Sequence, residues 1–112
     1  MIEISGDECF NKSDEQGYLV YYFTASWCKP CQRILGDIIK LSEDDNYNVS
    51  FYKIEITDED NNEICEKCGI KSVPSFLLFK DRTYIDRTVG ANIKNLKEMI
   101  ENIITNKKVV KD

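Results

Sequence analysis

Two cysteines separated by two residues, Cys28 and Cys31, lie where the sequence changes from a strand pattern to a helix pattern. Residues 18–23 form a continuous apolar run rich in aromatic and β-branched side chains, which is typical of a buried strand. From residue 32 to residue 41, apolar residues recur at helical spacing. The sequence therefore predicts a β-strand followed at once by an α-helix, with both cysteines at the junction.

This junction favours a reactive thiolate at Cys28. The first N–H groups of a helix have no intrahelical partner, and the helix dipole places partial positive charge at the same end. Both effects stabilise the thiolate, which is the nucleophilic form of cysteine. Pro30 suits a first helical turn, where no N–H is needed, and Lys29 adds a nearby cation. These local effects predict reactivity rather than burial for Cys28, with Cys31 close enough to close a small disulfide ring.

Length and charge limit the class of protein. The 112 residues predict one domain, which can bury a core without a structural metal or disulfide. The net charge of -5 argues against a nucleic-acid partner, because phosphate binding requires a basic surface. No segment resembles a membrane span, and the first residues lack the basic start and apolar run of a signal peptide. We therefore expect a cytoplasmic protein with no membrane partner, in a compartment where paired cysteines are mostly catalytic or metal-binding.

The rest of the chain alternates strand and helix patterns. Further strands are predicted over residues 1–4, 49–56, 75–80 and 83–89, and further helices over residues 5–12, 57–67 and 92–104. Ser5 and Thr57 are expected to open their helices, and Gly69 to end one. Residues 13–17 are expected to be a polar loop. This order predicts an α/β fold with a mixed central sheet of four to five strands and helices on both faces. Residues 1–105 would form the domain and residues 106–112 a charged, frayed tail.

Three motifs in this order make the chain resemble the thioredoxin family over nearly its whole length. Trp27-Cys28-Lys29-Pro30-Cys31 is similar to that family's Trp-Cys-Gly-Pro-Cys centre. Val73-Pro74 is similar to the family's Ile/Val-Pro pair, in which the proline is cis. Val89-Gly90-Ala91 is similar to the loop opposite the cysteines, and Lys53 stands where the family keeps a buried lysine. The resemblance implies a thioredoxin fold.

The resemblance also implies a protein-disulfide reductase. Cys28 would attack a substrate disulfide, and Cys31 would resolve the mixed disulfide that forms. The residues expected to hold the substrate chain in a shallow groove are Trp27, Lys29, Pro30, Val73, Pro74, Gly90 and Ala91. No cofactor or metal would be bound, because the redox-active group is the Cys28–Cys31 disulfide. The implied partners are disulfide-containing proteins and a recycling enzyme similar to thioredoxin reductase. A monomer would pass electrons between them and maintain the redox balance of the cell.

Two departures from the family pattern bear on this chemistry. Tyr22 stands where the family keeps a buried aspartate, which is assigned as the acid–base group for the resolving cysteine. Because a tyrosine with a reference pKa of about 10 is a poor base near neutrality, we expect Cys31 to deprotonate slowly or to rely on Lys53. Lys29 replaces a glycine, and its charge should lower the pKa of Cys28 and raise the reduction potential. The alternatives are a binding or adapter module with an idle cysteine pair, or a more oxidising, isomerase-like protein.

A second cysteine pair, Cys65 and Cys68, has helical spacing. Two Cys-x-x-Cys pairs raise the alternative of a four-cysteine zinc domain. However, 33 residues separate the pairs, and the chain contains no histidine. The common interval in such zinc sites is roughly 15–20 residues. We predict that one or both cysteines are small core residues, with a regulatory dithiol as a further alternative, and that Cys9 is buried in the first helix.

Overall fold

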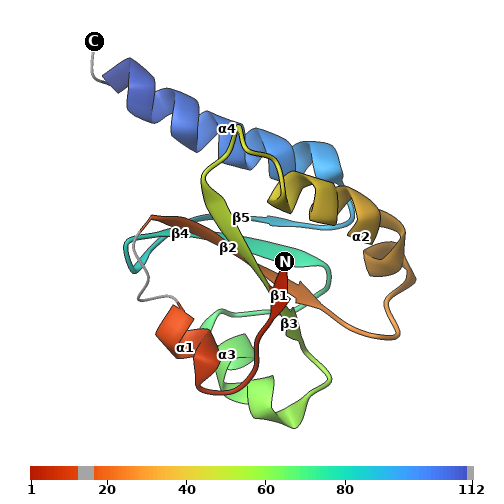
Figure 1. Cartoon of the computed structure of the whole chain (residues 1–112). Coiled ribbons are helices and arrows are strands. Elements are labelled where there is room, and N and C mark those ends of the chain that lie inside the picture. The colour runs from red at the N-terminus through yellow and green to blue at the C-terminus, as the bar shows by residue number, and fades with distance from the viewer. Residues whose placement is uncertain (13–16, 111–112) are drawn as a thin grey trace.

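Residues 1–12 and 17–110, which are the part of the chain described by this computed structural model, form a five-stranded sheet between two layers of helices (Figure 1). Side chains are described up to residue 103. The elements, in chain order, are β1 (Ile2–Glu3), α1 (Glu8–Lys12), β2 (Tyr18–Thr24), α2 (Lys29–Ser42), β3 (Val49–Glu55), a 3₁₀ turn (Glu59–Asn61), α3 (Asn62–Lys67), β4 (Ser75–Lys80), β5 (Thr83–Val89) and α4 (Ile93–Val110).

The sheet has the order β1-β3-β2-β4-β5. Strands β1, β3 and β2 run parallel, whereas β4 and β5 are antiparallel to their neighbours. Helices α2 and α4 cover one face, and α1 and α3 cover the other (Figure 1). The expected mixed sheet with helices on both faces is therefore confirmed.

Strand β2 occupies the centre of the sheet because it is apolar on both sides. Val20 and Tyr22 pack beneath α2 and α4, and Leu19, Tyr21 and Phe23 pack beneath α1 and α3. Every residue of the strand after its first is buried. A strand covered on both faces is apolar without alternation, which explains the continuous apolar run in the sequence.

Helix α2 begins at Lys29, three residues before the apolar periodicity starts. Its N-cap is Cys28, whose sulfur accepts a hydrogen bond from the Cys31 N–H. Pro30 occupies the first turn, as predicted. The buried stripe of the helix consists of Cys31, Ile34, Ile38 and Leu41. The first turn carries little apolar periodicity, so its position was predicted from the cysteine pair and Pro30 rather than from the apolar pattern.

Two other predicted helix starts were wrong. Helix α1 begins at Glu8 rather than Ser5, because Gly6 between them adopts a positive φ of +58° that interrupts a helix. Thr57 does not open a helix, because its hydroxyl donates instead to the Glu55 carboxylate at 2.8 Å. The carboxylate of Asp58 caps the 3₁₀ turn that precedes α3.

The end of α3 is as expected, whereas the end of α4 is not. Gly69, with φ of +64°, follows α3, and the Ile70 N–H returns to the Cys65 carbonyl, as in a Schellman motif. Helix α4 continues to Val110, past residue 104, because residues 105–110 contain no glycine or proline to stop it. Helix α4 therefore includes residues 106–110 of the expected tail, and the fraying of this tail stays a prediction. Residues 111–112, and residues 13–16 of the predicted polar loop, lie outside the described residues.

Strands β4 and β5 form a hairpin with the predicted bounds. Asp81 and Arg82 form the turn, with φ of +48° and +76°. Two consecutive positive φ angles match the right-handed twist of a tight hairpin. A bulge between Leu78 and Phe79 shifts the register, so that Phe79 pairs with Tyr84 and Leu77 pairs with Arg87. Because paired residues share a face, these four side chains lie on the α1/α3 side of the sheet.

Candidate active site

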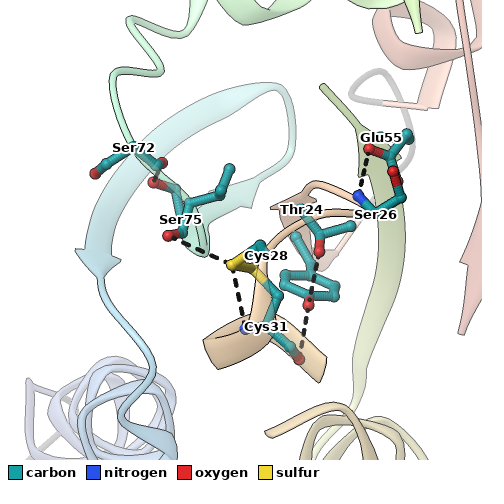
Figure 2. Close-up of a disulfide and its surroundings, with 9 residues drawn as sticks. Thr24, Ser26, Cys28, Cys31, Glu55, Ser72 and Ser75 are labelled. Carbon is teal, nitrogen blue, oxygen red and sulfur yellow. Dashed lines mark hydrogen bonds between the residues drawn. A yellow bond between two sulfur atoms is a disulfide. The ribbon is translucent and has the colours of Figure 1, made fainter. Parts of the chain in front are cut away.

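The candidate site is the Cys28–Cys31 disulfide at the start of α2 (Figure 2). The two Cα atoms are 5.3 Å apart, and the Cys31 N–H donates to the Cys28 sulfur over 3.2 Å. When the disulfide is reduced, the same N–H lies in position to stabilise a thiolate at Cys28. The predicted junction of strand, cysteine pair and helix is therefore present.

Both cysteines are nevertheless buried, which differs from the expectation for Cys28. Cys28 retains 4% of its surface and Cys31 none. They pack with Ala25 of the preceding loop and with Ile56 and Val73, which come from two distant segments of the chain. Sequence reasoning missed this packing because it considered only the local effects at the helix start. The residual exposure of the pair is confined to the residue Cys28.

The loop before β4 closes over the cysteine pair. The Cys28 sulfur lies 3.9 Å from the Val73 carbonyl oxygen. This contact becomes a hydrogen bond only when Cys28 is a protonated thiol, because a disulfide sulfur carries no hydrogen. The Val73–Pro74 peptide bond is cis, as in the family pattern. Ser75 donates across this loop to the Ser72 carbonyl over 2.7 Å (Figure 2).

The loop that contains Gly90 is hydrogen-bonded to the loop before β4. The Gly90 N–H donates to the Pro74 carbonyl over 2.8 Å, which brings the two predicted groove segments together. Gly90 has φ of +106°, a conformation that L side chains rarely adopt. A Cβ at this position would meet no atom of the chain within 4 Å, so the backbone conformation and not crowding within the chain favours glycine here.

Trp27 is 66% exposed, which makes it one of the most exposed large apolar residues described. The loop that carries it is held in place by the Ser26 N–H, which donates to the Glu55 carboxylate over 2.9 Å (Figure 2). Sequence reasoning missed Glu55, because an acidic residue at a strand end carries no distinctive pattern. An exposed indole beside Cys28 is positioned to contact another molecule.

Tyr22 is buried, with 1% of its surface exposed, and stacks on Phe76 with ring centroids 5.1 Å apart. Its hydroxyl lies 3.1 Å from the Thr24 hydroxyl and 3.4 Å from the Cys31 carbonyl oxygen. Burial raises the pKa of Tyr22 above its usual value, the hydrogen bond to the Thr24 hydroxyl lowers it in part, and the Glu55 carboxylate adds a smaller rise. Tyr22 therefore stays protonated near neutrality and serves as a hydrogen-bond donor. Thr24 was missed, although its position two residues along the same strand places it on the same face.

Lys53 lies beside Tyr22 in the register of β2 and β3. Its side chain is 30% exposed, and its ammonium group lies 3.9 Å from the Glu3 carboxylate of strand β1. Lys53 is therefore partly solvated rather than fully buried. The ion pair with Glu3 directs the Lys53 charge towards β1 at the edge of the sheet. An influence of Lys53 on the cysteines stays a prediction.

The remaining cysteines lie on the other face of the sheet and are free thiols. Cys9 is fully buried, and burial raises its pKa to about 11. Burial also raises the pKa values of Cys65 and Cys68, which are only partly buried. Within residues 1–12 and 17–103, whose side chains are described, no group of three or more potential ligands is arranged to hold a metal ion. The four cysteines of the two Cys-x-x-Cys pairs therefore do not form one zinc site in this part of the chain.

Known proteins share both the sequence and the fold. The thioredoxin family model matches residues 3–104. A thioredoxin-like protein of Acanthamoeba polyphaga mimivirus is 39% identical over 88 residues, which cover 78% of this chain and 63% of that protein, less than two thirds of its length. The thioredoxin of Ictalurus punctatus is 38% identical over 85 residues, which cover 75% of this chain and 78% of that protein. Oxidised mitochondrial thioredoxin 3 of Saccharomyces cerevisiae superimposes with a TM-score of 0.82 at 27% identity, covering 91% of this chain and 94% of that one.

Proposed function

The chain belongs to the thioredoxin family, whose members are protein-disulfide oxidoreductases, and we propose that it reduces protein disulfides through Cys28 and Cys31. One observation carries this proposal. Cys28 caps helix α2, accepts the Cys31 N–H at 3.2 Å and retains the only exposed surface of the pair. Cys28 is therefore suited to act as the attacking thiolate, and the buried Cys31 is suited to resolve the mixed disulfide that forms.

The thiol–disulfide exchange proceeds in two steps. The Cys28 thiolate attacks one sulfur of the substrate disulfide, so that a mixed disulfide forms and the other substrate sulfur leaves as a thiolate. The Cys31 thiolate then attacks the Cys28 sulfur, which forms the Cys28–Cys31 disulfide and releases the second substrate thiolate. The substrate gains two electrons and two protons, and the protein loses both.

The substrate chain would lie in an extended conformation beside Val73. Proline has no N–H, and in this chain Pro74 uses its carbonyl to accept from Gly90. The polar backbone groups of Val73 would then pair with the incoming chain in the manner of an added strand. Trp27, Lys29, Pro30 and Ala91 would line the groove, and the open space at Gly90 would admit the substrate backbone.

Tyr22 and Lys53 would tune the second step rather than take part in bond exchange. The Tyr22 hydroxyl would hold the Cys31 backbone, and the proton of Cys31 would leave without a buried carboxylate to accept it. We propose that the Lys53 ammonium assists by stabilising the Cys31 thiolate through space. This effect is expected to be weak, because Lys53 is partly solvated and paired with Glu3.

Family members act on disulfide substrates and are recycled by a thioredoxin reductase, and we propose the same class of partners for this chain, acting as a monomer without a bound cofactor. We also propose the cytoplasm as its location. Free thiols at Cys9, Cys65 and Cys68 suit a reducing compartment. Among the described residues, no helix combines the length and apolarity needed to cross a bilayer. Immunofluorescence of the tagged full chain tests the location, since one of the similar structures is a mitochondrial thioredoxin.

Reduction of insulin with dithiothreitol as electron donor tests the proposal. Cys28→Ser is expected to abolish turnover. In a separate incubation without dithiothreitol, the pre-reduced Cys31→Ser variant is expected to accumulate a mixed disulfide with insulin, which added reductant dissolves. Cys68→Ser, on the other face of the sheet, is the matched control and should retain turnover. Equal activity of wild type and Cys28→Ser would contradict the proposal and favour a binding or adapter module with an idle pair.

A further inference from the structure

A cavity of about 400 Å³ lies on the α1/α3 face of the sheet and shares no residue with the proposed substrate groove. Its wall is contributed by β2, β4, β5, α1, α3 and the hairpin turn. Pockets for small molecules typically measure about 300–1,000 Å³. The cavity therefore has the size of a site for a small organic molecule.

The hairpin bulge supplies the aromatic side of the cavity. Phe79 and Tyr84 are paired across the bulge, and their ring centroids lie 6.0 Å apart in an edge-to-face arrangement. Tyr84 remains 46% exposed, because α3 ends at Lys67 and does not cover this end of the sheet. An exposed ring beside a hollow offers a surface on which a planar group can stack.

The charged side chains around the cavity are all positive. Lys67, Arg82 and Arg87 line it, and no carboxylate does so within the described part of the chain. This is unexpected for a protein with a net charge of -5. Among residues 1–12 and 17–103, whose side chains are described, neither Lys67 nor Arg87 forms an ion pair with a carboxylate. Their charges therefore remain available to a ligand.

Arg87 links the aromatic and the charged sides. Its guanidinium carbon lies 5.2 Å from the centroid of the Tyr84 ring, and its Nε donates to the Tyr84 hydroxyl over 3.0 Å. These contacts hold a planar cation against the wall of the cavity. A guanidinium held in this way still has N–H groups that can bind a carboxylate or phosphate in a bidentate manner.

We propose that this cavity binds a small aromatic anion. The ring would pack against Tyr84 and Phe79, and the acidic group would pair with Arg87 and Lys67. A purely apolar ligand would leave these two charges without a partner, and a peptide would exceed the volume. The chemistry fits an aryl carboxylate, sulfonate or phosphate.

Cys68 provides an internal reporter of occupancy. Cys68, the C-cap residue of α3, lines the cavity, whereas Cys65 within α3 does not. Both thiols are partly buried, so both can be alkylated slowly. A ligand in the cavity should protect Cys68 and leave Cys65 unchanged.

The first test uses the full chain with the Cys28–Cys31 disulfide intact, and two fluorescent probes. Anilinonaphthalene sulfonate is an aromatic anion, and phenylnaphthylamine is its uncharged counterpart. The sulfonate should bind more tightly than the amine. Arg87→Gln should weaken sulfonate binding about tenfold, Arg87→Lys should restore part of it, and the exposed Lys94→Gln should change nothing.

The second test measures alkylation of Cys68 and Cys65 by peptide mass spectrometry, with and without the sulfonate. Slower alkylation of Cys68 alone supports the proposal. Equal affinity for the charged and uncharged probes, unchanged binding by Arg87→Gln, or equal protection of both cysteines would overturn it. Tighter binding of an acidic peptide than of the sulfonate would also overturn it, in favour of a protein-docking surface.

Discussion

The hydroxyl of Tyr22 lies 3.4 Å from the main-chain carbonyl oxygen of Cys31, so this buried tyrosine contacts the proposed resolving cysteine through its backbone. Burial raises the pKa of Tyr22, so the hydroxyl does not serve as a base near neutrality. The chain thus has a hydrogen-bond donor at the position where the family pattern has a carboxylate. This relationship makes the second step of the exchange the place where the chain should differ from its relatives.

Tyr22→Asp should shorten the lifetime of the mixed disulfide. A carboxylate at this buried position would have a raised pKa and would accept a proton above that pKa, so the acceleration should grow as the pH rises. Single-turnover release of a labelled disulfide peptide measures the step. Tyr22→Phe is the control: it removes the hydroxyl, should cost about 1 kcal/mol of stability and should not accelerate release. An unchanged release rate in Tyr22→Asp would contradict the role assigned to this position.

Lys29→Gln should lower the reduction potential of the Cys28–Cys31 pair. Lys29 is the first residue of α2 and is exposed, so its charge stabilises the reduced, thiolate form only through screened interactions. A change of about 10 mV is expected, from the usual strength of exposed charge pairs. Equilibration with glutathione buffers measures the shift. Lys40→Gln, in the last turn of the same helix, should leave the potential unaltered, and a rise in Lys29→Gln would refute the prediction.

Asn61→Ala should destabilise the fold by about 2–4 kcal/mol, because it breaks a buried polar network. Asn61 is 1% exposed, accepts from the Gly6 N–H over 2.9 Å and donates to the Glu55 carbonyl over 2.8 Å. These bonds connect the segment before α1 to the end of β3. Urea unfolding measures the loss. The exposed neighbour Asn62 offers the comparison, and a similar loss in Asn62→Ala would show that the network is not responsible.

Cys9→Ala should make the fold less sensitive to alkali. Burial raises the folded pKa of Cys9 from 9.0 to about 11, so between these values the unfolded state releases a proton that the folded state keeps. The contribution of this group to the free energy of unfolding is complete below pH 9, falls as the pH rises and is lost above about pH 11, a decrease of about 3 kcal/mol. Urea unfolding under reducing conditions at about pH 8.5 and about pH 10.5 measures how the free energy of unfolding changes with pH. Each value lies about half a unit below one of the two pKa values of Cys9. Parallel curves for wild type and Cys9→Ala would exclude this contribution.

Local patterns in the sequence correctly predicted the strands that show a continuous apolar run or a clear turn signal. Strand β2 is apolar on both faces, and the β4–β5 hairpin has a turn between two β-rich runs, so the predicted bounds of both strands of the hairpin were correct. The predicted start of α1 was wrong because Gly6 adopts a positive φ, and that of α3 because Thr57 hydrogen-bonds to Glu55 while Asp58 caps the preceding 3₁₀ turn. The sequence shows the candidates, whereas only the folded backbone shows which hydrogen bond forms.

The candidate site was predictable as far as it depends on neighbours in the chain. The cysteine pair at the helix start follows from local spacing, and its burial by Val73 and Ile56 depends on segments far apart in the sequence. The same holds for the contact between Tyr22 and Cys31, which requires the packing of α2 on β2. The cationic cavity is less visible still, because Lys67, Arg82 and Arg87 approach one another only across α3 and the hairpin.

The reduction potential of the Cys28–Cys31 pair tests the central claim most directly. Trp27, the only tryptophan, lies next to Cys28 and is exposed, so its fluorescence reports the state of the pair. Equilibration in thiol–disulfide buffers, confirmed by counting free thiols, should give a value near about -270 mV, as expected for a reductase of the thioredoxin kind. A value above about -200 mV would contradict the account and assign the chain an oxidising or isomerase-like role.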